Sequence, residues 1–374
     1  MNIVLIGPVY PYKGGISHYT GLMYRALKEK HNVTMISYKM QYPKLLFKKE
    51  QRDYSNDSFK VDETQFLINT ANPFNLISVA SKINKIDAEY VIFQWWHPYF
   101  APCYYILSKL IKNKKIVFIC HNVFPHERFP MDRLLCKMVL KQGDYFVVQS
   151  HLDEKDLLQV RSDAKYVVTP HPTYDVFNMS NMSKEAAREI LKVKKETPLL
   201  LFFGFVREYK GLKYLLRAMP AIKAQIPNIQ LWVVGDFGED KEDYIKLIEE
   251  NNIKDNIVVV EGYIPDQEVE KYFAATDLVV LPYISATQSG IVQIAYGFEK
   301  PVVVTNVGGL PDVVDHEQTG LIVEKESVED LAKAVIRFFD EDNAKHYTAK
   351  IKEKMEEFSW GTMVKRIEEL VKNR

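Results

Sequence analysis

The chain has 374 residues, a length that suits two α/β domains of roughly 100–200 residues each better than one core. Lysine plus arginine and aspartate plus glutamate both total 49, so no global field favours nucleic acid, and a bound anion must be held by local groups. Three cysteines without CxxC spacing, and an amino terminus that enters an apolar run without a basic leader, favour the cytoplasm.

Short apolar runs alternate with helix-period stretches along the whole chain. Because each run is nearly all apolar, both faces of the predicted sheets should be covered by helices, as in parallel α/β folds. The first predicted strands are Ile3–Ile6, Val33–Ser37, Tyr90–Gln94, Ile116–Cys120, Tyr145–Gln149 and Tyr166–Thr169. After a lapse between Pro170 and Pro198, typical of a linker, the pattern restarts. The second group is Leu199–Phe203, Gln230–Val234, Ile257–Val260, Leu278–Leu281, Pro301–Thr305 and Gly320–Val323.

The loop after the first predicted strand is rich in glycine and proline but does not follow the GxGxxG pattern. Gly14 and Gly15 let the backbone approach a ligand at the start of an amphipathic helix that runs through Leu27, where N–H groups point outward. Ser37-Tyr38, rather than an acidic residue, ends the second strand, which disfavours a nicotinamide dinucleotide. The loop therefore predicts an anion site, and a plain strand-to-helix turn is the alternative.

A basic run with three apolar residues, Lys44-Leu45-Leu46-Phe47-Lys48-Lys49, follows the second predicted strand. Clustered lysines beside apolar side chains suit contact with a membrane surface, although a solvated loop explains the run equally well. The longest aromatic and apolar stretch, Trp95 to Ile111, is broken by His97, prolines and Lys109, and it falls short of the ~20 residues that span a bilayer. Any membrane contact should be peripheral.

Aromatic residues and histidines occur at the ends of two further predicted strands. Trp96 and His97 lie in an aromatic cluster that could stack on a sugar or receive a lipid-linked acceptor, and core packing beneath a loop is the alternative. His121 ends the strand Ile116–Cys120, where its imidazole could donate to a sugar hydroxyl or phosphate, or take up a proton near neutral pH. Its alternative role is to cap the loop that follows.

Two cations follow the first strand of the second half. Arg207 and Lys210 lie between Gly204 and Gly211, in the loop before a helix predicted to begin near Leu212. A guanidinium grips phosphate oxygens in a fork and an ammonium adds a point charge, so the pair suits a diphosphate. Solvation is the alternative, but the flanking glycines permit close backbone approach and favour binding.

A helix start of small and polar residues, Thr287-Gln288-Ser289-Gly290-Ile291, lies between two predicted strands. Consecutive N–H groups at the positive end of a helix dipole would stabilise phosphate or sugar oxygens, and a plain N-cap is the alternative. This segment and the Arg207 loop both come just past the carboxyl end of a predicted strand, where open parallel sheets bind ligands. Together they are predicted to suit a diphosphate.

Taken in chain order, these motifs resemble glycosyltransferase family 4. The residues that carry the resemblance are Gly14-Gly15, His121, Gly204 with Arg207 and Lys210-Gly211, Leu281-Pro282-Tyr283, Gln288-Ser289-Gly290, Lys300-Pro301 and Gly308-Gly309-Leu310-Pro311. The resemblance implies a retaining glycosyltransferase of the GT-B fold, with two Rossmann-like domains facing each other across a cleft. It implies an acceptor domain over residues 1–175, completed by a returning helix over 359–374, and a donor domain over 176–358.

The resemblance also implies roles for individual residues. His121, Arg207 and Lys210 would be catalytic, the last two binding the donor diphosphate in place of a metal ion, so that neither metal nor cofactor is expected. Donor-binding residues would be Gly14, Gly15, Gln288, Ser289, Gly290, Ile291 and Gln293, and acceptor-binding residues Lys13, Trp96 and His97. The enzyme would move a sugar from a nucleoside diphosphate sugar to a glycan or lipid-linked glycan, in bacterial cell-surface polysaccharide synthesis at the inner face of the membrane.

One departure from the family pattern concerns two glutamates that many members carry with seven residues between them. The matching positions here are Ala286 and Ile294, and Gln293 stands beside the second. Two other functions stay open. A GT-B epimerase or hydrolase acting on a nucleotide sugar would need carboxylates near His121, where the sequence offers Glu127, and a non-catalytic subunit would bind the nucleotide sugar without transfer.

Overall fold

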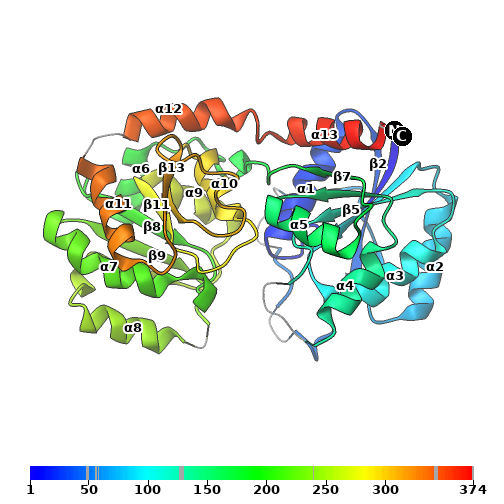
Figure 1. Ribbon diagram of the computed structural model, residues 1–374, viewed down its shortest axis with the longest axis horizontal. Coiled ribbons are helices and arrows are strands. Elements are labelled where there is room, and N and C mark those ends of the chain that lie inside the picture. The colour runs from blue at the N-terminus through cyan, green and yellow to red at the C-terminus, as the bar shows by residue number, and fades with distance from the viewer. Residues whose placement is uncertain are drawn as a thin grey trace. The chain divides into compact units, whose positions relative to one another are not determined.

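The computed structural model describes residues 1–47, 50–54, 57, 59–125, 130–238, 240–340 and 344–372. The chain forms two compact units, Met1–Pro170 with Trp360–Arg374, and His171–Ser359 (Figure 1). The sequence places the division at residue 175 instead. The segment after Pro170 joins the second unit because the Thr173 N–H donates to the Phe358 carbonyl at 3.0 Å and the Tyr174 N–H to the Gln293 carbonyl at 3.3 Å.

The first unit is built on a parallel sheet which, within the described residues, has seven strands in the order β3-β2-β1-β4-β5-β6-β7. The strands are β1 (Asn2–Ile6), β2 (Asn32–Met40), β3 (Gln65–Asn69), β4 (Tyr90–Trp95), β5 (Lys115–Cys120), β6 (Tyr145–Val148) and β7 (Tyr166–Val168). The sequence pattern misses β3, an edge strand in which only Ile68 is buried among the described side chains. Its apolar run, Phe66-Leu67-Ile68, has only three residues and stands between two amide side chains, so it is shorter than most of the runs that mark the other strands.

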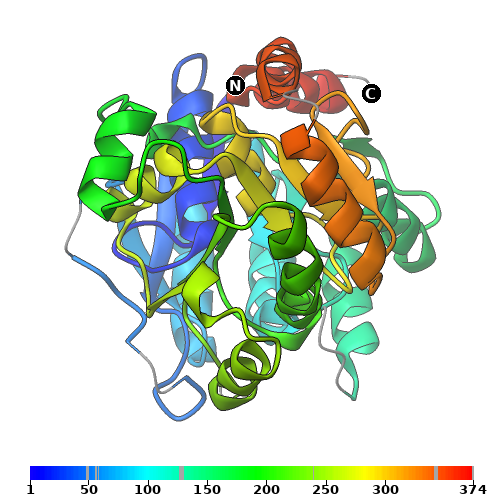
Figure 2. The ribbon, with the colours of Figure 1, turned by 90° about the vertical axis from the view of Figure 1, so that its left-hand side faces the viewer.

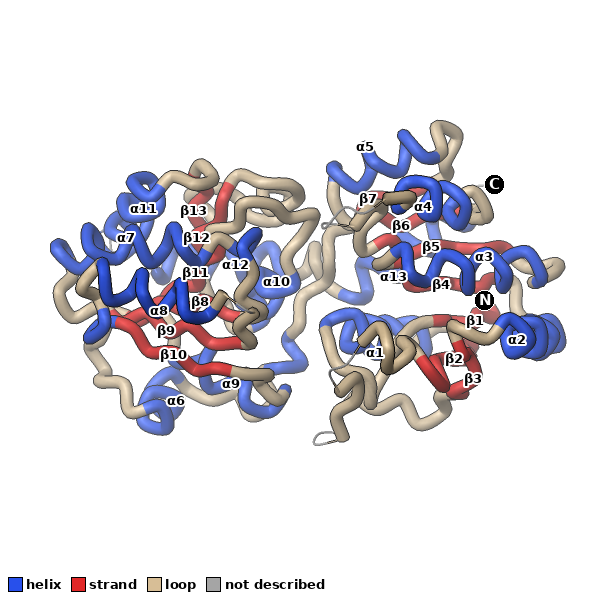
Figure 3. The backbone as a smooth tube through the Cα atoms, turned by 90° about the horizontal axis from the view of Figure 1, so that it is seen from below, coloured by secondary structure: helices blue, strands red, loops and turns tan. Residues whose placement is uncertain are grey.

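Helices cover both faces of this sheet (Figure 3). They are α1 (Gly15–Lys28), α2 (Pro73–Lys85), α3 (Ala101–Leu110), α4 (Asp132–Leu140), α5 (His151–Val160) and α13 (Trp360–Lys372), with the 3-10 turn η1 (Pro98–Phe100). Successive strand residues point to opposite faces. Val4 and Ile6 accordingly belong to the core beneath α2 and α3, whereas Ile3 and Leu5 pack in a second core with Met363 of α13.

The second unit repeats the plan with a parallel sheet of six described strands in the order β10-β9-β8-β11-β12-β13. These are β8 (Leu199–Phe203), β9 (Gln230–Gly235), β10 (Ile257–Glu261), β11 (Leu278–Leu281), β12 (Val302–Thr305) and β13 (Gly320–Val323). The helices are α6 (Lys184–Leu191), α7 (Leu212–Gln225), α8 (Lys241–Glu250), α9 (Asp266–Ala275), α10 (Gly290–Gly297), α11 (Val328–Asp340) and α12 (Ala344–Met355), and the 3-10 turns are η2 (Asp175–Phe177), η3 (Glu208–Lys210) and η4 (Lys254–Asn256). Helices α7 and α11 lie side by side (Figure 2).

The strand order reverses once in each sheet. In the first sheet β1 pairs in parallel with both β2 and β4, and in the second β8 pairs with both β9 and β11. Ligands of open α/β sheets bind beyond the carboxyl ends of the strands at this reversal. The loops after β8 and β11 carry the predicted diphosphate residues, so topology alone brings both loops to that position.

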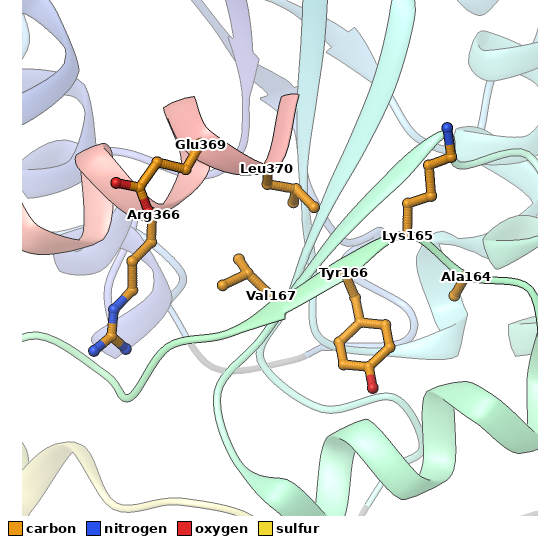
Figure 4. Close-up of a pocket in the computed structure, with 7 residues that line it drawn as sticks. All are labelled: Ala164, Lys165, Tyr166, Val167, Arg366, Glu369 and Leu370. Atoms are coloured by element: carbon orange, nitrogen blue, oxygen red, sulfur yellow. The ribbon is translucent and has the colours of Figure 1, made fainter. Parts of the chain in front are cut away.

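Helix α13 lies along the edge strand β7 and leaves a groove of about 560 Å³ between them (Figure 4). Its lining residues are Ala164, Lys165, Tyr166, Val167, Arg366, Glu369 and Leu370. None of the predicted site residues lines this groove. A search of the described residues finds no helix that combines the length and the apolar character needed to cross a membrane.

Candidate functional site

The loop after β8 lies against the loop after β11. Gly211 has a φ of +68°, and a Cβ atom there would lie 1.8 Å from the Pro282 carbonyl oxygen, so both its conformation and the close approach require glycine. The Ile284 N–H donates to the Tyr209 carbonyl at 2.8 Å. These contacts fix Arg207 and Lys210 beside the segment that leads into α10.

The two cations of this loop have no carboxylate partner among the described residues. Lys210 places its Nζ 3.9 Å from the centroid of the Tyr283 ring, and burial lowers its pKa to about 8. Arg207 donates from Nη1 to the Val206 carbonyl at 3.2 Å. The intervening Glu208 instead pairs with Lys213, Nζ to Oε1 at 3.0 Å. As far as the described residues show, the arrangement therefore leaves two positive charges for an anion.

Helix α10 begins beside these cations without a side-chain cap. Ser289 stands at the N-cap position, yet its side chain makes no capping hydrogen bond, and its hydroxyl lies 3.4 Å from the Tyr283 hydroxyl. Ser289 therefore does not cap the helix with its side chain, which is the alternative role predicted for this segment. Ile291 reaches across to the β8 loop, since its Cδ1 would lie 3.6 Å from a Cβ atom at Gly204. Ser289 is buried, whereas Gln288, Gly290 and Ile291 are partly exposed.

The loop after β12 supports the same segment from the other side. Gly308 has a φ of +53°, and a Cβ atom there would lie 1.5 Å from the Ala286 carbonyl oxygen. The Gly309 N–H donates to the Thr287 carbonyl at 3.0 Å. The loops after β8, β11 and β12 therefore contact one another through their backbones. These contacts leave no room for a Cβ atom at positions 211 and 308.

The positions of the two family glutamates are apolar and buried. Ala286 and Ile294 are 4% and 8% exposed. Gln293 is fully buried, and neither atom of its side-chain amide has a hydrogen-bond partner in the described part of the chain. The Gln293 amide therefore has unused hydrogen-bonding groups near the start of α10. Leaving such an amide buried without a partner costs about 1–3 kcal/mol.

In the first unit, the loop after β1 presents an uncapped helix start. Gly14 occupies the N-cap position of α1 with a φ of +104° and no side-chain capping bond. A Cβ atom on Gly14 or Gly15 would meet no atom within 4 Å, so packing against described residues does not explain the glycines. Lys13 is tied to the following loop, because its N–H donates to the Gln51 carbonyl at 3.0 Å.

His121 lies inside the first unit and is 1% exposed. Its Nε2 lies 2.7 Å from Oε1 of Gln94, an acceptor, which places the proton on Nε2. Its ring packs against Tyr19 edge to face at 4.5 Å between centroids. The sequence shows that a histidine ends β5, but it does not show that Gln94 of β4 and Tyr19 of α1 enclose it.

Trp96 and His97 follow β4. His97 Nδ1 accepts from the Tyr99 N–H at 3.1 Å and so caps η1. Trp96 packs on Phe100 with 4.2 Å between ring centroids. Both contacts fit the alternative role for this cluster, which is packing beneath a loop. Both side chains are nevertheless partly exposed.

The structure brings Arg207, Lys210 and the residues 287–291 together in the second unit. In the first unit, the backbone N–H of His121 donates to the Trp95 carbonyl at 2.8 Å, which links the ends of β4 and β5.

Sequence reasoning gave no role to Tyr283, which lies beneath Lys210, because nothing local distinguishes it from a core tyrosine. Predictions for Lys48, Lys49 and Glu127 fall outside the described residues.

Residues 183–355 match the protein family described as glycosyl transferases group 1. The D-inositol 3-phosphate glycosyltransferase of Corynebacterium aurimucosum is 26% identical over 249 residues, which are 64% of this chain and 59% of that protein. An uncharacterised glycosyltransferase of Methanocaldococcus jannaschii is 28% identical over 191 residues, which are 50% of this chain and 48% of that protein. The chain thus spans about half the length of the curated relatives it matches.

Solved structures share the fold over nearly the whole chain. Anabaena HepE, solved in complex with UDP and glucose, has a TM-score of 0.78 at 16% identity, with 100% of both chains covered. The sucrose-phosphate synthase of Thermosynechococcus elongatus has a TM-score of 0.74 at 20% identity, covering 99% of this chain and 98% of that one. With its two Rossmann-like parallel-sheet units the chain has the GT-B fold, and its second unit matches the group 1 glycosyltransferase family.

Proposed function

We propose that this protein transfers a sugar from a nucleoside diphosphate sugar to a glycan or lipid-linked glycan, with retention at the anomeric carbon. The observation that carries the proposal is the contact between the β8 and β11 loops. There Arg207 and Lys210, both without carboxylate partners among the described residues, lie beside the uncapped start of α10. Two cations and a helix amino terminus are the groups that stabilise a departing diphosphate.

Ligands bound in solved structures of the same fold agree with such a donor. Anabaena HepE was solved with UDP-glucose and with UDP, and a starch synthase of Arabidopsis thaliana with ADP and acarbose. These ligands support a nucleoside diphosphate sugar as the class of donor. Because Ala286 and Ile294 replace the family's glutamates, we propose that hydrogen bonds from α10, including those of Gln293, hold the donor sugar or ribose instead.

In the proposed reaction, Arg207 and Lys210 neutralise the negative charge that develops on the diphosphate as the bond to the sugar breaks. The departing phosphate oxygen takes the proton of the acceptor hydroxyl on the same face of the sugar, which accounts for retention without a carboxylate nucleophile. The scheme requires no metal ion.

The first unit would bind the acceptor. We propose that Lys13, Gly14 and Gly15, at the open start of α1, and Trp96 and His97, after β4, contribute to this site. Their partly exposed polar and aromatic groups suit a sugar. A glycan built on a lipid carrier would place the protein in cell-surface polysaccharide synthesis, at the cytoplasmic face of the membrane.

The test replaces Arg207 by alanine. Removing one charge donor from the transition state should lower turnover by about 10²–10³-fold. Transfer from UDP-glucose, GDP-mannose and ADP-glucose would be measured with a membrane extract as acceptor. Arg217→Ala, which removes an exposed arginine from α7, serves as the matched control and should keep wild-type turnover.

Three outcomes would contradict the proposal. Wild-type turnover in Arg207→Ala would remove the diphosphate assignment. Rapid conversion of the donor without acceptor would indicate an epimerase or hydrolase. Tight binding of a nucleotide sugar without transfer to any acceptor would indicate a non-catalytic subunit.

A further inference from the structure

Large apolar side chains are exposed on the first unit after β2 and on α2. Leu45 and Leu46 are 87% and 65% exposed, and Phe74 and Ile77 of α2 are 83% and 54% exposed. Phe47 is partly covered by Tyr42, with which it stacks at 5.6 Å between centroids. We define the exposed apolar face as the surface made by Lys44, Leu45, Leu46, Phe47, Phe74 and Ile77.

The turn that carries the leucines is an ordered piece of backbone. The N–H groups of Leu46 and Phe47 both donate to the Pro43 carbonyl, at 3.0 and 3.1 Å. Tyr42, just before it, packs against Tyr99 at 4.9 Å between ring centroids. The turn is therefore anchored to the unit's core through Tyr42, while Leu45 and Leu46 remain in solvent.

The turn and the start of α2 leave the sheet beside each other. The Thr70 hydroxyl donates to the Gln41 carbonyl at 2.7 Å, and the Thr70 N–H donates to the Met40 carbonyl at 3.3 Å. Leu45 lies four residues beyond Gln41, and Phe74 lies four residues beyond Thr70. The exposed side chains thus come from two segments joined at their bases.

The outer side of α2 adds charge of one sign. Leu76, Val79, Ala80 and Ile83 face the core. The exposed side begins with Phe74 and Ile77 and ends with Lys82 and Lys85. The ranges 39–49 and 73–85 contain four and two lysines respectively, and neither contains an aspartate or a glutamate. Exposed apolar side chains on two segments that carry lysines and no acids complement an anionic lipid surface, which offers acyl chains to the first and negative headgroups to the second.

We propose that the exposed apolar face docks on an anionic phospholipid bilayer, inserting Leu45, Leu46 and Phe74 among the acyl chains while Lys44 contacts lipid headgroups. This adds a membrane-docking surface to the proposed function and does not depend on sugar transfer. The surface lies on the unit that is proposed to bind the acceptor. A lipid-linked acceptor would then be met where its carrier is embedded.

The test is co-sedimentation of the full-length protein with vesicles of phosphatidylcholine alone and with phosphatidylglycerol added. Wild type should bind the anionic vesicles, and its binding should weaken with salt because lysine contacts are screened. The double change Leu45→Ser and Leu46→Ser should reduce binding about tenfold or more, since two leucines no longer enter the lipid. Lys44→Glu should reduce it about fivefold or more.

Controls alter exposed residues elsewhere. The double change Leu134→Ser and Ile190→Ser removes apolar side chains that are 60% and 54% exposed, and Lys30→Glu reverses an exposed charge in the turn after α1; neither should change vesicle binding. UDP binding, measured in parallel by calorimetry, reports on the donor site separately. Equal binding by wild type and the Leu45→Ser, Leu46→Ser variant, or no binding of wild type to either vesicle, would overturn the proposal. So would a wild-type dimer in light scattering that the same variant abolishes.

Discussion

Lys210 is partly buried and contacts an aromatic ring. Its ammonium lies over the Tyr283 ring at 3.9 Å from the centroid, and the attraction of a cation to an aromatic face does not compensate fully for lost hydration. Burial therefore lowers the pKa of Lys210 from 10.5 to about 8. A bound diphosphate would favour the charged form and raise this pKa again.

The pH dependence of nucleotide binding follows from this shift. As pH rises through about 8, the unliganded protein loses the Lys210 proton, and a bound diphosphate must restore it. We expect the affinity for UDP to fall above pH 8 by up to about tenfold per pH unit, with proton uptake on binding. Calorimetry from pH 7 to 9.5, in two buffers of different ionisation enthalpy, measures both quantities. The Lys210→Gln variant should bind more weakly with no such pH dependence; an equal fall in that variant would exclude Lys210 as its cause.

Residue identity points to the proposed diphosphate-binding residues of the second unit more readily than to the surroundings of His121. Arg207 and Lys210 are flanked by glycines in the sequence itself, so their loop could be recognised locally. The burial of His121 could not, because Gln94, which receives its hydrogen bond, lies 27 positions away on another strand. Whether a strand-end histidine faces inward depends on such distant partners.

At the scale of elements, the site depends on glycines where loops meet. A Cβ atom at Gly308 would lie 1.5 Å from the Ala286 carbonyl oxygen, so an alanine there must push back the segment that leads into α10. Gly262 also has a positive φ, +115°, but a Cβ atom on it would meet no atom within 4 Å. An alanine at either position would be strained by the positive φ. Only at Gly308 would its Cβ atom also collide with a carbonyl oxygen.

Replacing these glycines separates the two effects. Gly262→Ala should destabilise the protein by about 1–2 kcal/mol through strain alone. Gly308→Ala should cost roughly 4 kcal/mol or more and should weaken UDP binding, because the 286–290 backbone moves. Urea unfolding and calorimetry measure the two consequences. Equal losses of stability in both variants would show that the loop contact does not hold the segment in place.

Strand prediction succeeded where strands are buried on both faces and failed at one edge. The runs that became β1 and β8 are almost wholly apolar because helices cover both sides of them. In β3, Phe66 is partly exposed and polar residues stand at both ends, so the apolar signal that marks a central strand is missing. An edge strand needs less apolar surface than a central one. The edge strands β7, β10 and β13 are nevertheless predicted from their apolar residues, whereas β3 is not.

At the scale of the molecule, the end of the chain belongs to the first unit. Met363, Val364, Ile367 and Val371 of α13 are buried in the same core as residues of α1 and β1. The Tyr19 hydroxyl lies 3.1 Å from Met363 Sδ, and His31 pairs with Glu368 at 2.9 Å. Helical periodicity predicted this helix, whereas the family resemblance predicted its return to the first unit. The sequence of a helix does not show which surface the helix covers.

A substitution that creates a cavity on the buried face of α13 should therefore lower the stability of the first unit and leave that of the second unit unchanged. Ile367→Ala should cost about 2–4 kcal/mol, the usual loss for a buried isoleucine. Hydrogen exchange followed by mass spectrometry should show faster exchange in β1 and β5, with β8 and β11 unchanged. Val335→Ala, in the buried face of α11, should give the reverse pattern. Faster exchange in β8 but not in β1 after Ile367→Ala would contradict the assignment of α13.

The central claim is that the strand ends of the second unit, at β8 and β11, bind a diphosphate through Arg207, Lys210 and the start of α10. A crystal structure with bound UDP tests it most directly. We expect the phosphate oxygens to lie within hydrogen-bonding distance of the Arg207 guanidinium, the Lys210 ammonium and the N–H groups of Gly290 and Ile291. UDP bound with its phosphates away from these groups, while Arg207 still donates to the Val206 carbonyl, would contradict it.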